Sequence, residues 1–119
     1  MARTILIVED NAVDRSRLEK LLGAAGYMVR TAENGIQALA AAKQSKPDAI
    51  LMDVNMPEMD GFAATRALRA DASTKSIPIV LVTAKDQKAD KAWGQMLGAV
   101  GYVTKPYTDE QVLAQVRAL

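Results

Sequence analysis

Short apolar runs alternate with segments of helical spacing along the whole chain. We predict five strands, at Thr4–Val8, Tyr27–Thr31, Ala49–Met52, Ile79–Val82 and Val100–Val103. The second run alternates apolar and polar residues, which is typical of an edge strand. The first, third and fourth runs are almost continuously apolar. Such runs are typical of a parallel sheet that is covered on both faces.

The first two segments between the strands carry helix start and stop signals. One helix is predicted over Ala12–Ala24, with glycines at its end. The next is predicted to begin at the N-cap Asn34, with Gln37 completing a box-like pattern, and to stop before Pro47. The residues expected to face the core are Leu18, Leu21, Leu22 and Ala25 in the first helix and Ile36, Leu39 and Ala40 in the second.

Three further helices follow from the same signals. A short one is predicted over Phe62–Arg69 with Asp60 as its cap, and another over Gln87–Leu97 with Gly98 as its stop. Thr108–Gln111 fits a capping box that opens the last helix. The residues that this helix is expected to bury are Val112, Leu113, Val116 and Leu119.

Alternating strands and helices predict an α/β fold of five βα units in a single domain, residues 1–119. Right-handed crossovers then place helices on both faces of the sheet. We therefore expect a doubly wound, parallel five-stranded sheet in the order 2-1-3-4-5, the flavodoxin-like arrangement. Ligands of such sheets bind at the carboxyl ends of the strands, near the switch point between strands 1 and 3.

Polar residues follow four of the predicted strands. Glu9 and Asp10 follow the first strand, Asp53 the third, Thr83 the fourth and Lys105 the fifth. In a parallel sheet all of these positions lie on one edge. Carboxylates, a hydroxyl and an ammonium on one edge are suited to binding an anion and a divalent cation.

Each of these residues also has a simpler interpretation. Glu9, Asp10 and Asn11 could cap the first helix, where acidic residues interact favourably with the helix dipole. Asp53 could cap a loop, Lys105 could be an ordinary surface lysine, and Thr83 is unremarkable in a strand. Beside a metal, Asp53 would instead be an oxygen nucleophile toward phosphorus. The joint occurrence of these residues at strand ends favours the phosphoryl-transfer interpretation.

Composition narrows the chemistry. The 119 residues contain no cysteine and no histidine, which excludes disulfides, thiolate nucleophiles, Ser-His triads and most zinc sites. The net charge of +1, from 15 basic and 14 acidic residues, gives no reason to expect nucleic acid or a membrane as a partner. The first apolar run is too short for a signal sequence or a membrane span, so we expect a cytoplasmic protein.

The chain resembles CheY-like response-regulator receiver domains over essentially its whole length. The resemblance rests on Ile7–Asn11, Leu51–Gly61, Val82–Lys85 and Gly101–Pro106, and the Asp-x-x-Met-Pro-x-Met-Asp-Gly pattern that starts at Asp53 is the most specific part. It implies a signalling protein, not an enzyme beyond its own phosphorylation and dephosphorylation. A histidine kinase, for which a CheA-like kinase is one candidate, would transfer a phosphoryl group from phosphohistidine to Asp53.

The same resemblance implies roles for the other residues at this edge. Mg²⁺ would be bound by Asp10 and Asp53 through their side chains, by Asn55 through its backbone carbonyl, and by Glu9 largely through water. Thr83 and Lys105 would bind phosphate oxygens, and the bond between Lys105 and Pro106 would be cis. Glu9 is a departure, because the family more often has Asp there, and its reach differs by one methylene.

The resemblance also implies a switch. Phosphate would draw the Thr83 hydroxyl inward, and the Tyr102 ring would turn into the vacated space. The face formed by the fourth helix, the fifth strand and the fifth helix would then change for a downstream protein. Tyr102 could alternatively just pack at a sheet edge. Lys85 borders the path of water to Asp53 and, together with Asn55, could tune dephosphorylation.

Residues Ala84–Ala99 resemble regulators of twitching motility, which is driven by type IV pili, in their Lys-Asp-Gln, Asp-Lys and Trp-Gly elements. This resemblance implies a role in pilus-driven or chemotaxis-like motility. Trp93 is the single tryptophan, and it could pack in the core, lie partly covered on the surface or contact a partner.

Four functions remain open from the sequence. We expect a stand-alone response regulator, because no output domain follows the last helix. The alternatives are a receiver fragment of a longer transcription factor or hybrid kinase, a phosphate-independent scaffold, and an aspartate-nucleophile phosphatase. Such phosphatases typically carry a second Asp two residues after the nucleophile, and Asn55 at that position argues against one.

Overall fold

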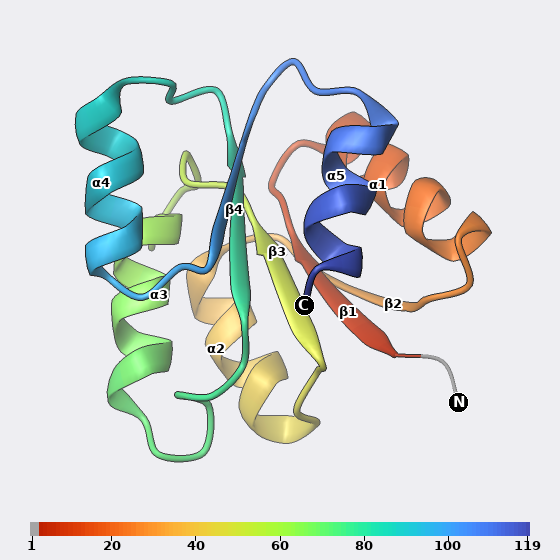
Figure 1. The fold of residues 1–119 in the computed structure, drawn as a ribbon. Coiled ribbons are helices and arrows are strands. Elements are labelled where there is room, and N and C mark those ends of the chain that lie inside the picture. Colours follow the sequence, from red (N-terminus) through yellow and green to blue (C-terminus); the bar gives the residue numbers. More distant parts are fainter. Residues whose placement is uncertain (1–2) are drawn as a thin grey trace.

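Five parallel strands form one sheet in the order β2-β1-β3-β4-β5 (Figure 1). The structure is a computed structural model that describes residues 3–119, so Met1 and Ala2 of the predicted domain lie outside the described residues. The elements are β1 (Thr4–Val8), α1 (Ala12–Ala24), β2 (Met28–Ala32), α2 (Gly35–Gln44), β3 (Ala49–Met52), α3 (Gly61–Ala70), β4 (Ile79–Thr83), α4 (Lys88–Met96), β5 (Gly101–Thr104) and α5 (Asp109–Arg117). The predicted fold class and strand order are confirmed.

Helices cover both faces of the sheet. Helices α1 and α5 lie on one face, and α2, α3 and α4 lie on the other (Figure 1). Alternate residues of β1 divide between the two layers, because successive side chains of a strand point to opposite faces. Ile5 and Ile7 pack with residues of α1 and α5, whereas Leu6 and Val8 pack with residues of α2 and α3. The two cores therefore meet at the sheet.

Three strands differ from the prediction by one residue: β2 and β5 are each shifted by one residue toward the C-terminus, and β4 extends to Thr83. Strand β2 begins at Met28 instead of Tyr27, because the Tyr27 N–H donates to the Leu22 carbonyl and closes the end of α1. The Met28 N–H then donates to the Arg3 carbonyl, which starts the pairing with β1. Strand β5 covers Gly101–Thr104 and pairs its last residue with Thr83 of β4.

The prediction for the inward face of α2 was wrong for two of its three residues, whereas Leu39 packs against the core as expected. Ile36 is 51% exposed and Ala40 is also exposed, while Ala38 and Ala42 are buried. The helix starts at Gly35, whose N–H donates to the Met59 carbonyl at 3.1 Å. Small residues at this contact let the helix approach its neighbours closely, and their position sets which face is inward. In α1, Ala25 is likewise exposed, because it is the C-cap and lies beyond the last helical turn.

The start of α3 is fixed against the chain that leaves β3. The Asp60 side chain accepts from the Ala63 N–H at 2.8 Å, as the predicted cap requires. The helix includes Gly61, one residue earlier than predicted, and the Gly61 N–H donates to the Val54 carbonyl. A Cβ atom at Gly61 would overlap the Asp53 carbonyl oxygen. The close approach therefore needs glycine, and it holds the backbone of Asp53 in place.

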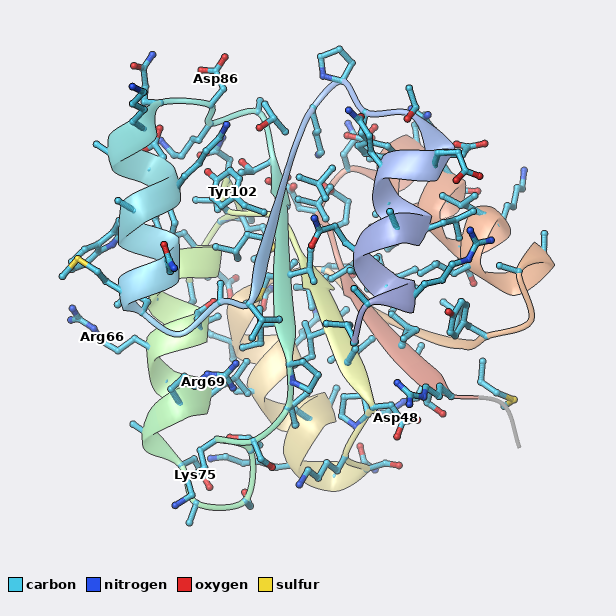
Figure 2. The ribbon with its side chains drawn as sticks, viewed as in Figure 1. Asp48, Arg66, Arg69, Lys75, Asp86 and Tyr102 are labelled. Carbon is cyan, nitrogen blue, oxygen red and sulfur yellow. The ribbon has the colours of Figure 1, made fainter. Side chains whose placement is uncertain are left out.

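Arg69 joins three segments that the sequence does not connect. From α3 its guanidinium donates to the carbonyls of Lys75 and Ile77, before β4, and to the carbonyl of Gly98, after α4 (Figure 2). Gly98 has a positive φ of 107°, a backbone conformation that favours glycine. The end of α4 is thus anchored to α3 at the edge of the sheet opposite the carboxyl ends.

Paired glycine substitutions test the close approach at Gly61. Gly61→Ala is expected to lower the free energy of unfolding by about 2–3 kcal/mol, because the methyl group forces backbone to shift. Gly23→Ala is the matched control, because a Cβ atom there meets nothing within 4 Å inside a helix. It is expected to raise the free energy of unfolding by about 0.5–1 kcal/mol. Urea denaturation measures both, and a neutral Gly61→Ala would contradict the packing argument.

Candidate functional site

Backbone hydrogen bonds continue past the strand ends and position the candidate residues. The Glu9 N–H donates to the Ala32 carbonyl and the Asp53 N–H to the Val8 carbonyl, both at 3.0 Å. The Lys105 N–H donates to the Thr83 carbonyl at 2.8 Å. Each residue therefore extends the ladder by one step, so its side chain leaves a fixed backbone. The structure brings the strand-end residues together at one edge.

Three carboxylates meet at this edge. Glu9, Asp10 and Asp53 each offer an oxygen atom, and these atoms all lie within 4.8 Å of one another. Glu9 is 1% exposed and Asp53 is 7% exposed, whereas Asp10 is exposed. Buried carboxylates at this spacing repel each other and lose hydration, and a cation between them would offset both costs. The set of oxygen donors suits a hard divalent cation such as Mg²⁺.

Lys105 is the cation that the described residues supply. Its Nζ atom lies 2.9 Å from Glu9 Oε2, 3.2 Å from Asp53 Oδ2 and 3.2 Å from Asp14 Oδ2. The peptide bond between Lys105 and Pro106 is cis. Asp14, in the first turn of α1, was missed by the sequence reasoning. Asp10 precedes the N-cap Asn11, so no helical spacing connects it with Asp14, and the partner Lys105 lies 91 residues away in the sequence.

The helix-capping role falls to Asn11 and not to Glu9. The Asn11 side-chain oxygen accepts from the N–H groups of Val13 and Asp14, both at 3.0 Å. Glu9 instead turns its Oε2 atom to Lys105, and its backbone carbonyl accepts from the Arg15 guanidinium at 2.9 Å. The two interpretations offered for this acidic segment therefore hold for different residues within it.

Burial and charge set the pKa values of Glu9 and Lys105. Burial raises the pKa of Glu9 from its ordinary value of 4.5 to about 7, against the lowering effect of Lys105 and with a further raising effect of Asp53. Burial alone lowers the pKa of Lys105, but its hydrogen bond to Glu9 and the charges of Asp53 and Glu9 outweigh burial, so its pKa is raised. Lys105 therefore stays charged, while Glu9 is costly to ionise.

A second group of contacts leads from the site toward α4. Thr83 is fully buried, and its hydroxyl oxygen accepts from the Lys85 N–H at 3.4 Å. The Tyr102 hydroxyl donates to the Lys85 carbonyl at 2.7 Å. Figure 2 shows Tyr102 beside α4, toward the end of the molecule where Asp86 lies. Burial, followed by the charges of Asp90 and other carboxylates, raises the pKa of Tyr102 to about 12.

Helix α4 lies close to this tyrosine. A Cβ atom at Gly94 would lie 2.8 Å from Leu81 Cδ1 and 3.5 Å from the Tyr102 ring. Gly94 therefore allows close packing of α4 on β4 and β5. Trp93, the next residue, is 41% exposed and lies under the Arg66 guanidinium, 5.7 Å from the ring centroid. It is a partly covered surface aromatic, and it lines a groove between α3 and α4.

Asn55 and Lys85 lie beside the phosphoryl-accepting position that the sequence indicates. The Asn55 N–H donates to Asp53 Oδ1 at 3.3 Å, and Asn55 itself is exposed. Lys85 is held through its backbone to Thr83 and Tyr102. Within residues 3–119, no helix is both long enough and apolar enough to cross a membrane.

The chain is similar in sequence to known proteins, over the full or partial length of each. The family model for the response regulator receiver domain matches residues 5–117. Protein PilH of Pseudomonas aeruginosa is 47% identical over 119 residues, which are 100% of this chain and 98% of the relative. Response regulator PleD of Caulobacter vibrioides is 44% identical over the whole chain, which spans 26% of PleD.

Solved structures give the same result. Chemotaxis protein CheY4 of Vibrio cholerae superposes with a TM-score of 0.93 and 35% identity, over 99% of this chain and 98% of that one. The receiver domain of the sensor histidine kinase PA1611 of Pseudomonas aeruginosa superposes with a TM-score of 0.91 and 34% identity, over 99% of this chain and 97% of that one. That structure has a magnesium ion coordinated in its active site cleft. These matches confirm the resemblance that the motifs predict.

The raised pKa of Glu9 predicts a pH dependence of stability. Because its pKa is higher in the folded than in the unfolded protein, the folded state binds more protons between about pH 4.5 and 7. The free energy of unfolding of the metal-free protein is therefore expected to fall by about 2–3 kcal/mol from pH 5 to pH 8. Urea denaturation across this range measures the effect, and the absence of histidine keeps the background titration small.

Glu9→Gln is the control for this prediction. The variant cannot ionise at this position and is expected to show little change in stability from pH 5 to pH 8. Excess Mg²⁺ is expected to reduce the dependence in the wild type, because a metal binds the ionised carboxylate. Equal pH profiles of the two metal-free proteins would contradict the assignment to Glu9.

Proposed function

The chain belongs to the response regulator receiver domain family, and from this we propose that it accepts a phosphoryl group on Asp53 from a histidine kinase. The observation that carries the proposal is the Asp53 carboxylate, buried among two other acidic residues, with Lys105 Nζ 3.2 Å away. An Asp53 carboxylate oxygen forms a new bond to phosphorus. The bond between phosphorus and the donor's imidazole nitrogen breaks, and the imidazole leaves with the electron pair.

Mg²⁺ is the proposed cofactor, and the residues present suit it. Glu9, Asp10 and Asp53 place carboxylate oxygens within reach of one cation, and the backbone carbonyl of Asn55 is a further candidate ligand. When bound, Mg²⁺ neutralises charge on the transferring phosphoryl oxygens. Side chains of the site would make the remaining contacts with the phosphoryl oxygens. Lys105 supplies a fixed positive charge for a phosphate oxygen, and the Thr83 hydroxyl can donate to another.

The contacts around Asp53 support signalling over hydrolysis of external substrates. An aspartate-nucleophile phosphatase needs an acid to protonate its leaving group, and Asn55 cannot titrate at that position. Asn55 and the backbone of Lys85 instead flank Asp53 and Thr83, where they would control access of water. Asn55 and Lys85 would therefore influence how long the phosphoryl group stays on Asp53.

We propose that the output surface is formed by α4, β5 and α5. The contacts from Thr83 through Lys85 to Tyr102 connect the phosphoryl site with this surface. Movement of the Thr83 hydroxyl toward a phosphate would release the Lys85 N–H, and the Tyr102 ring could then turn. Phosphorylation shifts the equilibrium between the two arrangements only by its different contacts in each. A downstream protein would read the change.

The relatives support a proposal for the pathway, the location and the kinase with which the protein acts. Similarity to PilH over the full length supports a stand-alone receiver of residues 1–119, acting in the cytoplasm in pilus-driven or chemotaxis-like motility. A CheA-like histidine kinase is then a reasonable donor, with neither nucleic acid nor membrane as a direct partner. PleD, of which the chain spans 26%, supports the alternative that this receiver is part of a longer protein.

Phosphorylation at Asp53 is directly testable. Acetyl phosphate with Mg²⁺ is expected to add one phosphoryl group to the wild type and none to Asp53→Asn, because the amide is not a nucleophile. Intact-mass spectrometry measures the addition. Asp48→Asn, at an exposed carboxylate on the opposite edge of the sheet, is the control and is expected to label like the wild type. Equal labelling of Asp53→Asn would contradict the assignment.

The proposed route from Asp53 to α4 predicts that one substitution can separate phosphorylation from the response of α4. Thr83→Ala is expected to accept the phosphoryl group but to lose most of the change in Trp93 emission that phosphorylation causes in the wild type. The reason is that the variant lacks the hydroxyl whose movement toward the phosphate would release the Lys85 N–H. Thr83→Ser keeps the hydroxyl and is expected to retain the change. A full emission change in Thr83→Ala would show that the signal bypasses Thr83.

A further inference from the structure

Asp14 is the one carboxylate around Lys105 that the proposed chemistry does not use. Its Oδ2 atom lies 3.2 Å from Lys105 Nζ, the same distance as Asp53 Oδ2. Glu9 and Asp53 come from strand ends and are almost fully buried, whereas the Asp14 side chain comes from α1 and is 40% exposed. It can therefore exchange Lys105 for water at small cost, as partly exposed ion pairs do.

The other charged residues of α1 near this site have different partners. The Arg15 guanidinium pairs with Glu33 and donates to the Glu9 carbonyl. Arg17 stacks on the Tyr107 ring and donates to the Tyr107 carbonyl. Among the described residues, the ion pair recorded for Asp14 is the one with Lys105. The helix cap does not depend on the Asp14 side chain, because Asn11 provides it.

A metal ion at the acidic cluster changes the balance around Lys105. Carboxylate oxygens of Glu9 and Asp53 that turn to a cation are less available to the lysine. Asp14 is then the remaining carboxylate that holds Lys105 Nζ. An incoming phosphoryl group must compete with Asp14 for the same ammonium, and it must also approach an additional negative charge.

We propose that Asp14 is a positioning residue that holds Lys105 in the resting site and lowers the affinity for the phosphoryl donor. The inference rests on the proposed function, because it concerns how Lys105 is divided between Asp14 and the phosphoryl group. Asp14 touches neither the donor nor Asp53 in this account and acts through Lys105. It sets how much donor is needed to phosphorylate the protein.

The test compares phosphorylation kinetics at several acetyl phosphate concentrations with saturating Mg²⁺. Asp14→Asn is expected to lower the half-saturating concentration about two- to fivefold, the range expected for loss of one partly exposed ion pair. The maximal rate is expected to change less, because the reacting groups are intact. Asp14→Glu keeps the charge and is expected to stay close to the wild type.

Glu19→Gln is the matched control. It removes one negative charge from an exposed position further along the same helix and is expected to leave the half-saturating concentration unchanged. If Asp14→Asn behaves like Glu19→Gln, or raises the half-saturating concentration, the inference is overturned. If the wild type itself is not labelled at Asp53, the proposed function fails instead.

A second readout needs neither metal nor phosphoryl donor. In the metal-free protein, Asp14→Asn is expected to shift the ¹⁵N NMR signal of the Lys105 ammonium and to increase its mobility, and Glu19→Gln is expected to do neither. An unchanged Lys105 signal in Asp14→Asn would overturn the inference, whatever the labelling experiment shows.

Discussion

The crowding of carboxylates at the carboxyl edge of the sheet is the constraint on which the rest of this structure depends. Two unit charges about 4 Å apart interact by about 4 kcal/mol near a protein surface, so Glu9, Asp10 and Asp53 share an edge at a cost that a nearby cation or protonation of Glu9 can offset. Lys105 is such a cation in the resting protein, and its backbone is held by the ladder to Thr83. The packing of Gly61 against Asp53 fixes the other side of the site. Architecture and electrostatics are therefore coupled at the same few residues.

The same edge is mechanically connected with a distant surface by few intermediates. Thr83 and Tyr102 both contact the backbone of Lys85, one through its N–H and the other through its carbonyl. Tyr102 in turn packs near Gly94, where even a methyl group would collide with Leu81. Such tight packing responds to a displaced ring by moving, because interiors have little free volume. Arg69 anchors the end of α4 that follows Gly94, through the Gly98 carbonyl.

Sequence reasoning reached the fold and the strand-end residues, because both depend on local patterns. Runs of apolar residues and the polar residues after them can be recognised without knowing how the side chains pack. Leu39 of α2 was predicted correctly, but Ile36 was not, because Ile36 is apolar while the contact of Gly35 with Met59 decides how the helix is rotated. Arg69 and Asp14 could not be read from their neighbours in sequence. The Gly98 carbonyl that Arg69 contacts lies 29 residues away and the Lys105 ammonium that Asp14 contacts lies 91 residues away, and only the assembled sheet brings them together.

The shared lysine has a consequence for how the resting and phosphorylated states balance. Contacts that stabilise Lys105 among Glu9, Asp14 and Asp53 stabilise the resting state, and a phosphoryl group must offer more than it displaces. Stronger contacts of Lys105 with these carboxylates would stabilise the unphosphorylated state in the absence of a signal, but they would also make phosphorylation harder. Because the proposed function gives Glu9 and Asp53 roles in metal binding and in the reaction, it leaves neither free to vary. Asp14 has neither role in this proposal, so it is a position at which the balance can be adjusted while the chemistry is left intact.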